Sequence, residues 1–278
     1  MTALLAVASA LLVGGADFIG GFLSRTVDAV RVAALAQVVG LVLAVPAALV
    51  VESERVTTTD AAWAVGSGVT VGLGLVCFYT AMTRGLISVV APVTAVTGAL
   101  VPVLYALGAG ERPGGAAVTG IALAIVAIGL VSLGSAGAAE AAASRDALPL
   151  AIVAGILFGL FYVCFARVHE DAGLWPVAIS RLTSAFVLVA LAIVLTRGVA
   201  VGRASAPWVS AIGALEVAAA VTLLLALQRG PVSVASVLVS LYPVTTTFLA
   251  ALVLRERLRG LQLAGVALAL VAVALISS

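Results

Sequence analysis

Long runs without a charged residue dominate this sequence of 278 residues. Seven runs of 19 or more residues carry no charge, and three more runs of similar length carry one charged residue each. A helix needs about 20 apolar residues to cross the hydrocarbon core of a bilayer. Only 9% of the residues are charged, whereas soluble domains carry about 25%. The runs therefore predict an all-α integral membrane protein with ten transmembrane helices.

The three spans that contain an ion are Met1–Ser24, Ala172–Thr196 and Ala204–Gln228. The uncharged spans are Val32–Val51, Ala61–Thr83, Gly85–Gly110, Pro113–Ala139, Ala147–Ala166, Gly230–Leu254 and Gly260–Ser278. Helices are predicted because no span alternates polar and apolar residues, as the strands of a transmembrane barrel do. The first span lacks a basic leading segment, so we expect it to be retained and not cleaved as a signal peptide.

Several classes of function are excluded by the polar residues that the chain lacks. The net charge of +2 is too small for a nucleic-acid surface. His169 is the single histidine, and Cys77 and Cys164 lie in separate apolar runs, so we expect free thiols, no metal site and no cofactor. The sequence has no nucleophile–base cluster and no Walker motif, which argues against an enzyme and against ATP as the direct energy source.

The second half of the chain repeats part of the first. A shift of 145 positions superposes Ala81–Ser132 on Ala226–Ser277 without a gap, and 19 of the 52 residues are identical. The matched residues include the pairs Arg84 and Arg229, Ser88 and Ser233, and Glu111 and Glu256. We predict a first repeat over 1–137, a linker over 138–146 and a second repeat over 147–278. Five spans in each repeat place the second copy upside down, as in transporters that open to the two membrane faces in turn.

The order of these features resembles the EamA family of the drug/metabolite transporter superfamily. The resemblance rests on Gly110-Glu111-Arg112 followed by Gly120, on Arg255-Glu256-Arg257 followed by Gly265, and on the opening helix around Gly15–Gly20. The chain departs from the family pattern at Gly14, where a Trp is common, and at Arg255, which replaces a Gly. The resemblance implies a secondary transporter, with export expected, of small metabolites, amino acids or drugs across the bacterial cytoplasmic (inner) membrane. It also implies that spans 1, 3, 4, 6, 8 and 9 surround the cavity, which adds Tyr79 and Tyr162 as candidates.

Asp17, Arg181 and Glu216 are the three ions within predicted spans. A charge at the bilayer centre costs at least about 2.5 kcal/mol, so such a residue usually faces a cavity, a partner or water. Either acid could bind a cationic group of a substrate or carry a proton, and either could instead be structural. Arg181 could bind a substrate carboxylate, pair with Glu216 or extend toward the membrane surface.

Two spans that the repeat makes equivalent carry hydroxyl groups and prolines. The fourth span contains Thr94 and Thr97 with Pro92 and Pro102, and the ninth contains Ser240 and Tyr242 with Pro243. Proline frees a backbone carbonyl group one turn earlier in a helix, and such groups are tolerated in a membrane only beside protein or a wet cavity. These residues therefore either line a pathway and bend as gates, or they pack helices together. Glycines in the third span and Gly155 and Gly159 in the sixth predict close helix contacts.

Arginine is unevenly distributed between the two sets of loops. Loops after odd-numbered spans carry nine arginines and loops after even-numbered spans carry four. The positive-inside rule then places both termini outside the cytoplasm. The expected partners are a small-molecule substrate, the lipid bilayer and, as a candidate coupling ion, the proton. A monomer is compatible with the sequence, and the alternative to a transporter is a membrane scaffold or a lipid-handling protein.

Overall fold

The computed structural model describes all residues except 25, 85–86, 134–144, 254–259 and 278. Regular secondary structure in the described residues is entirely helical, with eleven α-helices and three short 3-10 helices. The predicted linker falls almost entirely on residues outside the described ones. The helices are α1 (Thr2–Leu23), α2 (Ala29–Val50), α3 (Thr58–Arg84), α4 (Ile87–Gly108), α5 (Gly115–Leu133), α7 (Leu148–Ala166), α8 (Trp175–Thr196), α9 (Ala206–Arg229), α10 (Val232–Val239), α11 (Tyr242–Val253) and α12 (Gly260–Ser277).

Each predicted span coincides with one of these helices, except for the ninth. Within the described ranges, six helices are long and apolar enough to cross a membrane, and four further apolar segments are shorter. The charged residues predicted most helix ends correctly, because an ion is cheap at the interface and costly in the hydrocarbon. Multiple apolar helices of this length make the chain a multi-pass integral membrane protein.

The ninth predicted span is two helices and not one. α10 ends at Val239 and α11 begins at Tyr242, so Ser240 and Leu241 lie between them. Pro243 is the second residue of α11, where its missing N–H group costs nothing because the first turn of a helix has no internal acceptor for it. In a continuous helix the same ring would collide with the carbonyl group of Val239. The expected bend at Pro243 is therefore a complete break, whereas α4 runs through Pro102 without interruption.

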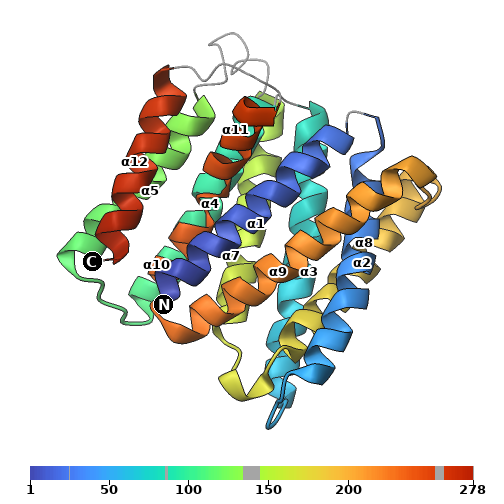
Figure 1. Ribbon diagram of the computed structural model, residues 1–278, viewed down its shortest axis with the longest axis horizontal. Coiled ribbons are helices and arrows are strands. Elements are labelled where there is room, and N and C mark those ends of the chain that lie inside the picture. The colour runs from blue at the N-terminus through green and yellow to red at the C-terminus, as the bar shows by residue number, and fades with distance from the viewer. Residues whose placement is uncertain (25, 85–86, 134–144, 254–259, 278) are drawn as a thin grey trace.

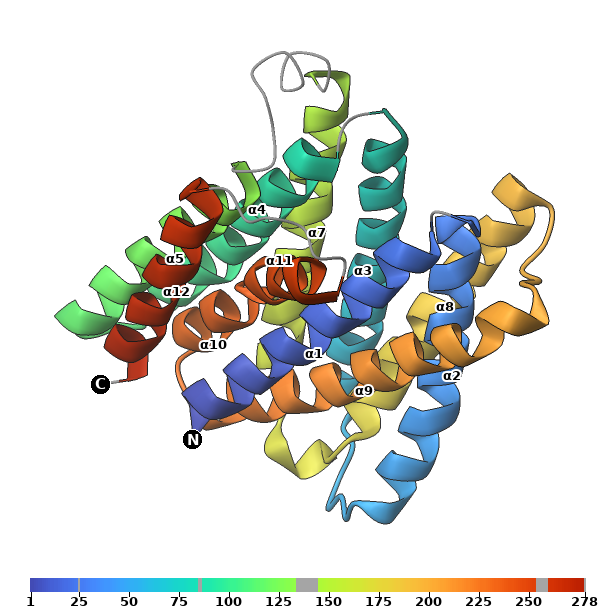
Figure 2. The same ribbon diagram turned by 45° about the horizontal axis from the view of Figure 1, so that its top comes forward.

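Helices from the two halves of the chain pack against one another and do not form separate lobes. α1 packs against α9, α3 against α7, and α4 against α7. α5 and α12 lie side by side at one edge of the molecule, and α2 and α8 lie together at the opposite edge (Figures 1 and 2). The N-terminus lies beside the turn between α9 and α10, where the Thr2 hydroxyl group donates to the Arg229 carbonyl group.

Glycine permits the closest of these helix contacts, as the sequence predicted. A Cβ atom added to Gly155 would lie 2.6 Å from the Thr94 carbonyl oxygen, and one added to Gly159 would lie 2.5 Å from the Val101 Cβ atom. A Cβ atom on Gly68 of α3 would lie 2.5 Å from the Ser180 carbonyl oxygen of α8. Backbones this close leave no room for any larger residue, so these glycines fix the spacing of α3, α4, α7 and α8.

A buried carboxylate joins two loops at one end of the bundle. Asp60 is fully buried in the first turn of α3, where it accepts hydrogen bonds from the backbone N–H and hydroxyl groups of Thr57. It also accepts a bond from the His169 backbone N–H at 3.0 Å and lies 2.9 Å from His169 Nδ1. Asp60 therefore caps its own helix and anchors the loop between α7 and α8.

Candidate functional site

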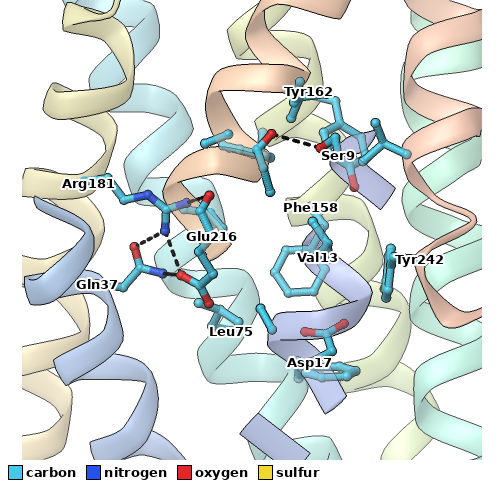
Figure 3. Close-up of a pocket in the computed structure, with 18 residues that line it drawn as sticks. Ser9, Val13, Asp17, Gln37, Leu75, Phe158, Tyr162, Arg181, Glu216 and Tyr242 are labelled. Carbon is cyan, nitrogen blue, oxygen red and sulfur yellow. Dashed lines mark hydrogen bonds and ion pairs between the residues drawn. The ribbon is translucent and has the colours of Figure 1, made fainter. Parts of the chain in front are cut away.

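A cavity of about 150 Å³ lies between the helices of the two halves (Figure 3). Among the described residues its wall comes mainly from α1, α3, α7 and α9, and it is completed by one residue each from α2, α8, α10 and α11. The lining residues are Ser9, Val13, Ala16, Asp17, Gln37, Val71, Leu75, Phe78, Phe158, Phe161, Tyr162, Arg181, Glu216, Ala219, Ala220, Leu223, Val239 and Tyr242. All three ions that the sequence places within spans face this one cavity.

Arg181 and Glu216 form an ion pair in the wall. Arg181 Nη1 lies 2.8 Å from Glu216 Oε2, and Arg181 Nη2 donates to the Glu216 backbone carbonyl group at 2.7 Å. Gln37 completes the cluster: its side-chain carbonyl group accepts a bond from Arg181 at 2.7 Å, and its amide donates to Glu216 Oε2 at 2.8 Å. The Ser184 hydroxyl group donates to the same Gln37 oxygen at 2.8 Å. These bonds connect α2, α8 and α9.

The cluster is buried, and its two charges cancel. The Arg181 side chain is 10% exposed and the Glu216 side chain is 25% exposed. Gly40 makes room for the arginine, because a Cβ atom there would lie 3.3 Å from Arg181 Cδ. The sequence left three alternatives open for Arg181. In the structure it forms the ion pair with Glu216, and it does not extend to the membrane surface. A buried pair whose remaining hydrogen-bonding groups are satisfied can persist in a medium of low polarity.

Asp17 has a different environment from Glu216. It projects from α1 into the cavity, its side chain is exposed there, and it has no hydrogen-bond or ion-pair partner among the described residues. Ser9, Val13 and Asp17 recur every four residues and share the cavity face of α1. Gly14, three residues before Asp17, packs against α11, where the Thr246 hydroxyl group donates to its carbonyl group at 3.2 Å.

Aromatic rings cover much of the remaining wall. Tyr162 and Tyr242, both predicted as site residues, line the cavity together with Phe78, Phe158 and Phe161. The Phe78 and Phe158 rings meet edge to face, with their centroids 6.0 Å apart. In the view of Figure 3 the Arg181 cluster lies on one side and Tyr242 lies on the other, and Phe158, Val13 and Asp17 lie between them.

No described residue of the fourth predicted span is among those that line the cavity, and its two threonines follow the helix-packing alternative that the sequence left open. Thr94 is fully buried and donates to the Ala151 carbonyl group of α7 at 3.1 Å. Thr97 donates to the Val93 carbonyl group of its own helix. Both hydroxyl groups are bonded to backbone because α4 packs directly on the glycines of α7. The polar face of α4 is therefore a helix contact.

Three further candidates lie near the cavity or outside what the structure describes. Ser240 is 1% exposed and donates to the Ser236 carbonyl group at 2.8 Å. It does not line the cavity, but it lies next to the Tyr162 side chain, which does. The side chains of Tyr79 and Pro92 are not among the described ones.

Gln37 and Ser9 are the polar residues of the described lining that the sequence analysis did not predict, and Gln37 has the larger role. It is 1% exposed and contacts both members of the ion pair. A search for charges overlooks a neutral amide, yet Gln37 is the one amide or ion in its predicted span from Val32 to Val51. A buried amide needs hydrogen-bond partners for its oxygen and its NH2 group. A lone amide in an apolar span therefore indicates that polar groups from other helices lie next to it. Among the described residues no group of three or more histidine, cysteine or acidic side chains could hold a metal ion.

The fold and the cavity define a multi-pass membrane protein with a partly polar chamber between its helices. The model of the EamA-like transporter family matches residues 1–133 and 147–278, so the chain belongs to that family. A solved structure described only as "Crystal structure of protein" shares the fold, with a TM-score of 0.77 and 22% identity over 99% of this chain and 95% of its own. No curated protein matches the sequence.

Proposed function

We propose that this protein is a secondary transporter that exports small molecules across the bacterial cytoplasmic membrane by alternating access. The observation that carries the proposal is the cavity, which brings all three intramembrane ions together between helices from both halves of the chain. Polar residues at membrane depth normally face a substrate or ion pathway. Membership of a transporter family points the same way and argues against an enzyme.

The pattern of helix contacts supports an inverted repeat. With α10 and α11 counted as one span, the repeat exchanges each span with the one five places along. It pairs α1 with α7, α2 with α8, α3 with α9, α4 with α10 and α11, and α5 with α12. Under this exchange the α1–α9 contact corresponds to the α3–α7 contact. In the same way the α1–α11 contact corresponds to the α4–α7 contact, and the α2–α9 contact to the α3–α8 contact. The α2–α8 and α5–α12 contacts map onto themselves. A two-fold relation of this kind gives a transporter two states of similar packing, each open to one membrane face.

The proposed roles follow from the two environments of the acids. Asp17 binds a cationic group of the substrate or the coupling proton, since no group among the described residues neutralises it. The Arg181–Gln37–Glu216 cluster holds α2, α8 and α9 together beside the cavity. Tyr162 and Tyr242 contact the bound substrate, while Pro243 and the break before it allow α10 and α11 to move separately. The arginine distribution favours both termini outside, which a reporter fused to the C-terminus tests.

The test of the proposal has two stages. Purified protein is first screened for thermal stabilisation against a panel of metabolites and drugs, because a ligand that binds the folded state raises the melting temperature. A stabilising compound is then used in flux measurements on proteoliposomes, with and without a pH gradient. Flux that is saturable and lost in Asp17→Asn, but kept in the exposed-loop variant Glu54→Gln, is the expected result. Absence of both stabilisation and flux would favour a scaffold or a lipid-handling protein.

A further inference from the structure

The charges that face the cavity do not balance. Its described lining contains one cation, Arg181, and two acids, Asp17 and Glu216. Arg181 and Glu216 neutralise each other at 2.8 Å. With Asp17 ionised, the cavity therefore has a formal excess of one negative charge, located on the Asp17 carboxylate.

Arg181 is not free to bind a substrate carboxylate in this arrangement. Its Nη1 atom already donates to both Gln37 and Glu216, at 2.7 and 2.8 Å, and its Nη2 atom donates to a backbone carbonyl group at 2.7 Å. Recruiting this guanidinium would leave a buried glutamate without its counter-ion, and an uncompensated buried charge is strongly unfavourable. An anionic group entering the cavity would also meet the unpaired Asp17.

The surroundings of Asp17 favour an organic cation. The residues that line the cavity with it are largely apolar and aromatic, including Val13, Phe158 and Tyr242. An ionised carboxylate beside such a wall attracts a counter-ion more strongly than it would in bulk water, because the local dielectric constant is lower. Aromatic faces attract an ammonium group as well, and the apolar wall accommodates a hydrocarbon body.

We infer that the substrates are small organic monocations, amines with an apolar body, and that molecules carrying a free carboxylate are discriminated against. The inference rests on the proposed transport function, and it specifies the substrate class of the same cavity. It separates simple amines from amino acids of the same shape, because an amino acid adds a carboxylate for which the described lining offers no free cation. The cavity volume of about 150 Å³ restricts the body to a small one.

Four compounds that share one phenyl body test the inference by binding to the purified full-length protein. They are 2-phenylethylamine, a cation; 2-phenylethanol, neutral; phenylalanine, a zwitterion; and 3-phenylpropionate, an anion. We expect the amine to bind most tightly. Asp17→Asn should weaken amine binding by roughly 30-fold or more, the usual effect of removing one partner of a buried charge pair. Glu54→Gln, in an exposed loop, should bind the amine as the wild type does.

The controls separate a lost charge from a lost fold. Asp17→Glu keeps the charge and should restore most of the amine binding, and unliganded melting temperatures show whether each variant folds. Phenylalanine binding as tightly as the amine would overturn the inference, as would unchanged amine binding in Asp17→Asn. Binding of none of the four compounds would overturn it too. Saturable flux of a different solute in proteoliposomes would in that case still support a transporter, so the two proposals can fail independently.

Discussion

Removing one member of the Arg181–Glu216 pair should cost much more stability than removing both. Arg181→Met would leave Glu216 buried with a single side-chain donor, the Gln37 amide at 2.8 Å. Breaking a buried ion pair costs about 3–5 kcal/mol, whereas replacing the whole pair by apolar residues is often neutral. Arg181→Met should therefore destabilise strongly, and the double variant Arg181→Met/Glu216→Met should recover most of the loss.

The expected shift in melting temperature follows from these values. Each kcal/mol corresponds to about 2–4 °C for a chain of this length, so the single variant should melt roughly 6–20 °C below the wild type. The assay is thermal unfolding of purified protein in one detergent, with all variants prepared in parallel. Arg203→Met, at an exposed arginine, is the matched control and should change the stability by less than about 0.5 kcal/mol.

One result would refute this account of the cluster. If the double variant melted as low as Arg181→Met, removal of the arginine would act through lost packing and not through an orphaned acid. Gln37→Leu gives a second check, since it deletes bonds to both ions but leaves the pair itself. The loss of stability in Gln37→Leu should be smaller than that in Arg181→Met. It should largely disappear when Gln37→Leu is added to the double variant, as expected for residues that act as one unit.

Three further changes test other contacts by the same melting assay. Gly159→Val would place a Cβ atom 2.5 Å from a side chain of α4 and should cost about 1–3 kcal/mol; Gly129→Val, where no atom lies within 4 Å, should be tolerated. Asp60→Asn should cost about 2 kcal/mol or more, because a fully buried carboxylate that accepts four hydrogen bonds becomes an amide. Glu111→Ala should cost about 1 kcal/mol, since it removes a cap from the N-terminus of α10. Glu54→Ala is the control for Asp60→Asn and Glu111→Ala. A loss of stability in Glu54→Ala as large as in those two variants would contradict the roles assigned to Asp60 and Glu111.

Much of the fold could be predicted from the sequence because charge is expensive inside a bilayer. The runs between charged residues located the helices. The same free-energy cost of burying a charge in the bilayer identified Asp17, Arg181 and Glu216 as candidates, and all three line one cavity. The break between α10 and α11 was not predictable to the same degree. A proline near the middle of an apolar run is compatible with a kink or with a new helix start, and the structure shows a new helix that begins at Tyr242.

The polar residues without charge were the harder part of the site. Thr94 and Gln37 both lie in uncharged spans, yet Thr94 bonds to a neighbouring helix and Gln37 faces the cavity. Periodicity identifies the face of a helix on which a residue lies, but it does not identify what that face meets. The glycines of α7 decide the matter for Thr94, because they bring α4 within contact distance of α7, and that information resides in a different span.

A contact between the two halves gives a physical reason for one feature of the repeat. Glu111, in the loop after α4, accepts a hydrogen bond at 3.2 Å from the Ser233 backbone N–H group in the first turn of α10. No side chain of α10's own N-cap residue fills this role, and a carboxylate is favourable at the positive end of a helix dipole. Glu111 and Ser233 are both repeat-matched positions, and their counterparts in the sequence are Glu256 and Ser88, whose side chains lie outside the described ones. The cap uses the backbone N–H group of Ser233, so it depends on the glutamate and not on the serine side chain. A cap used once would need a single glutamate, whereas a glutamate at both matched positions is what we expect if a loop of each repeat caps a helix of the other.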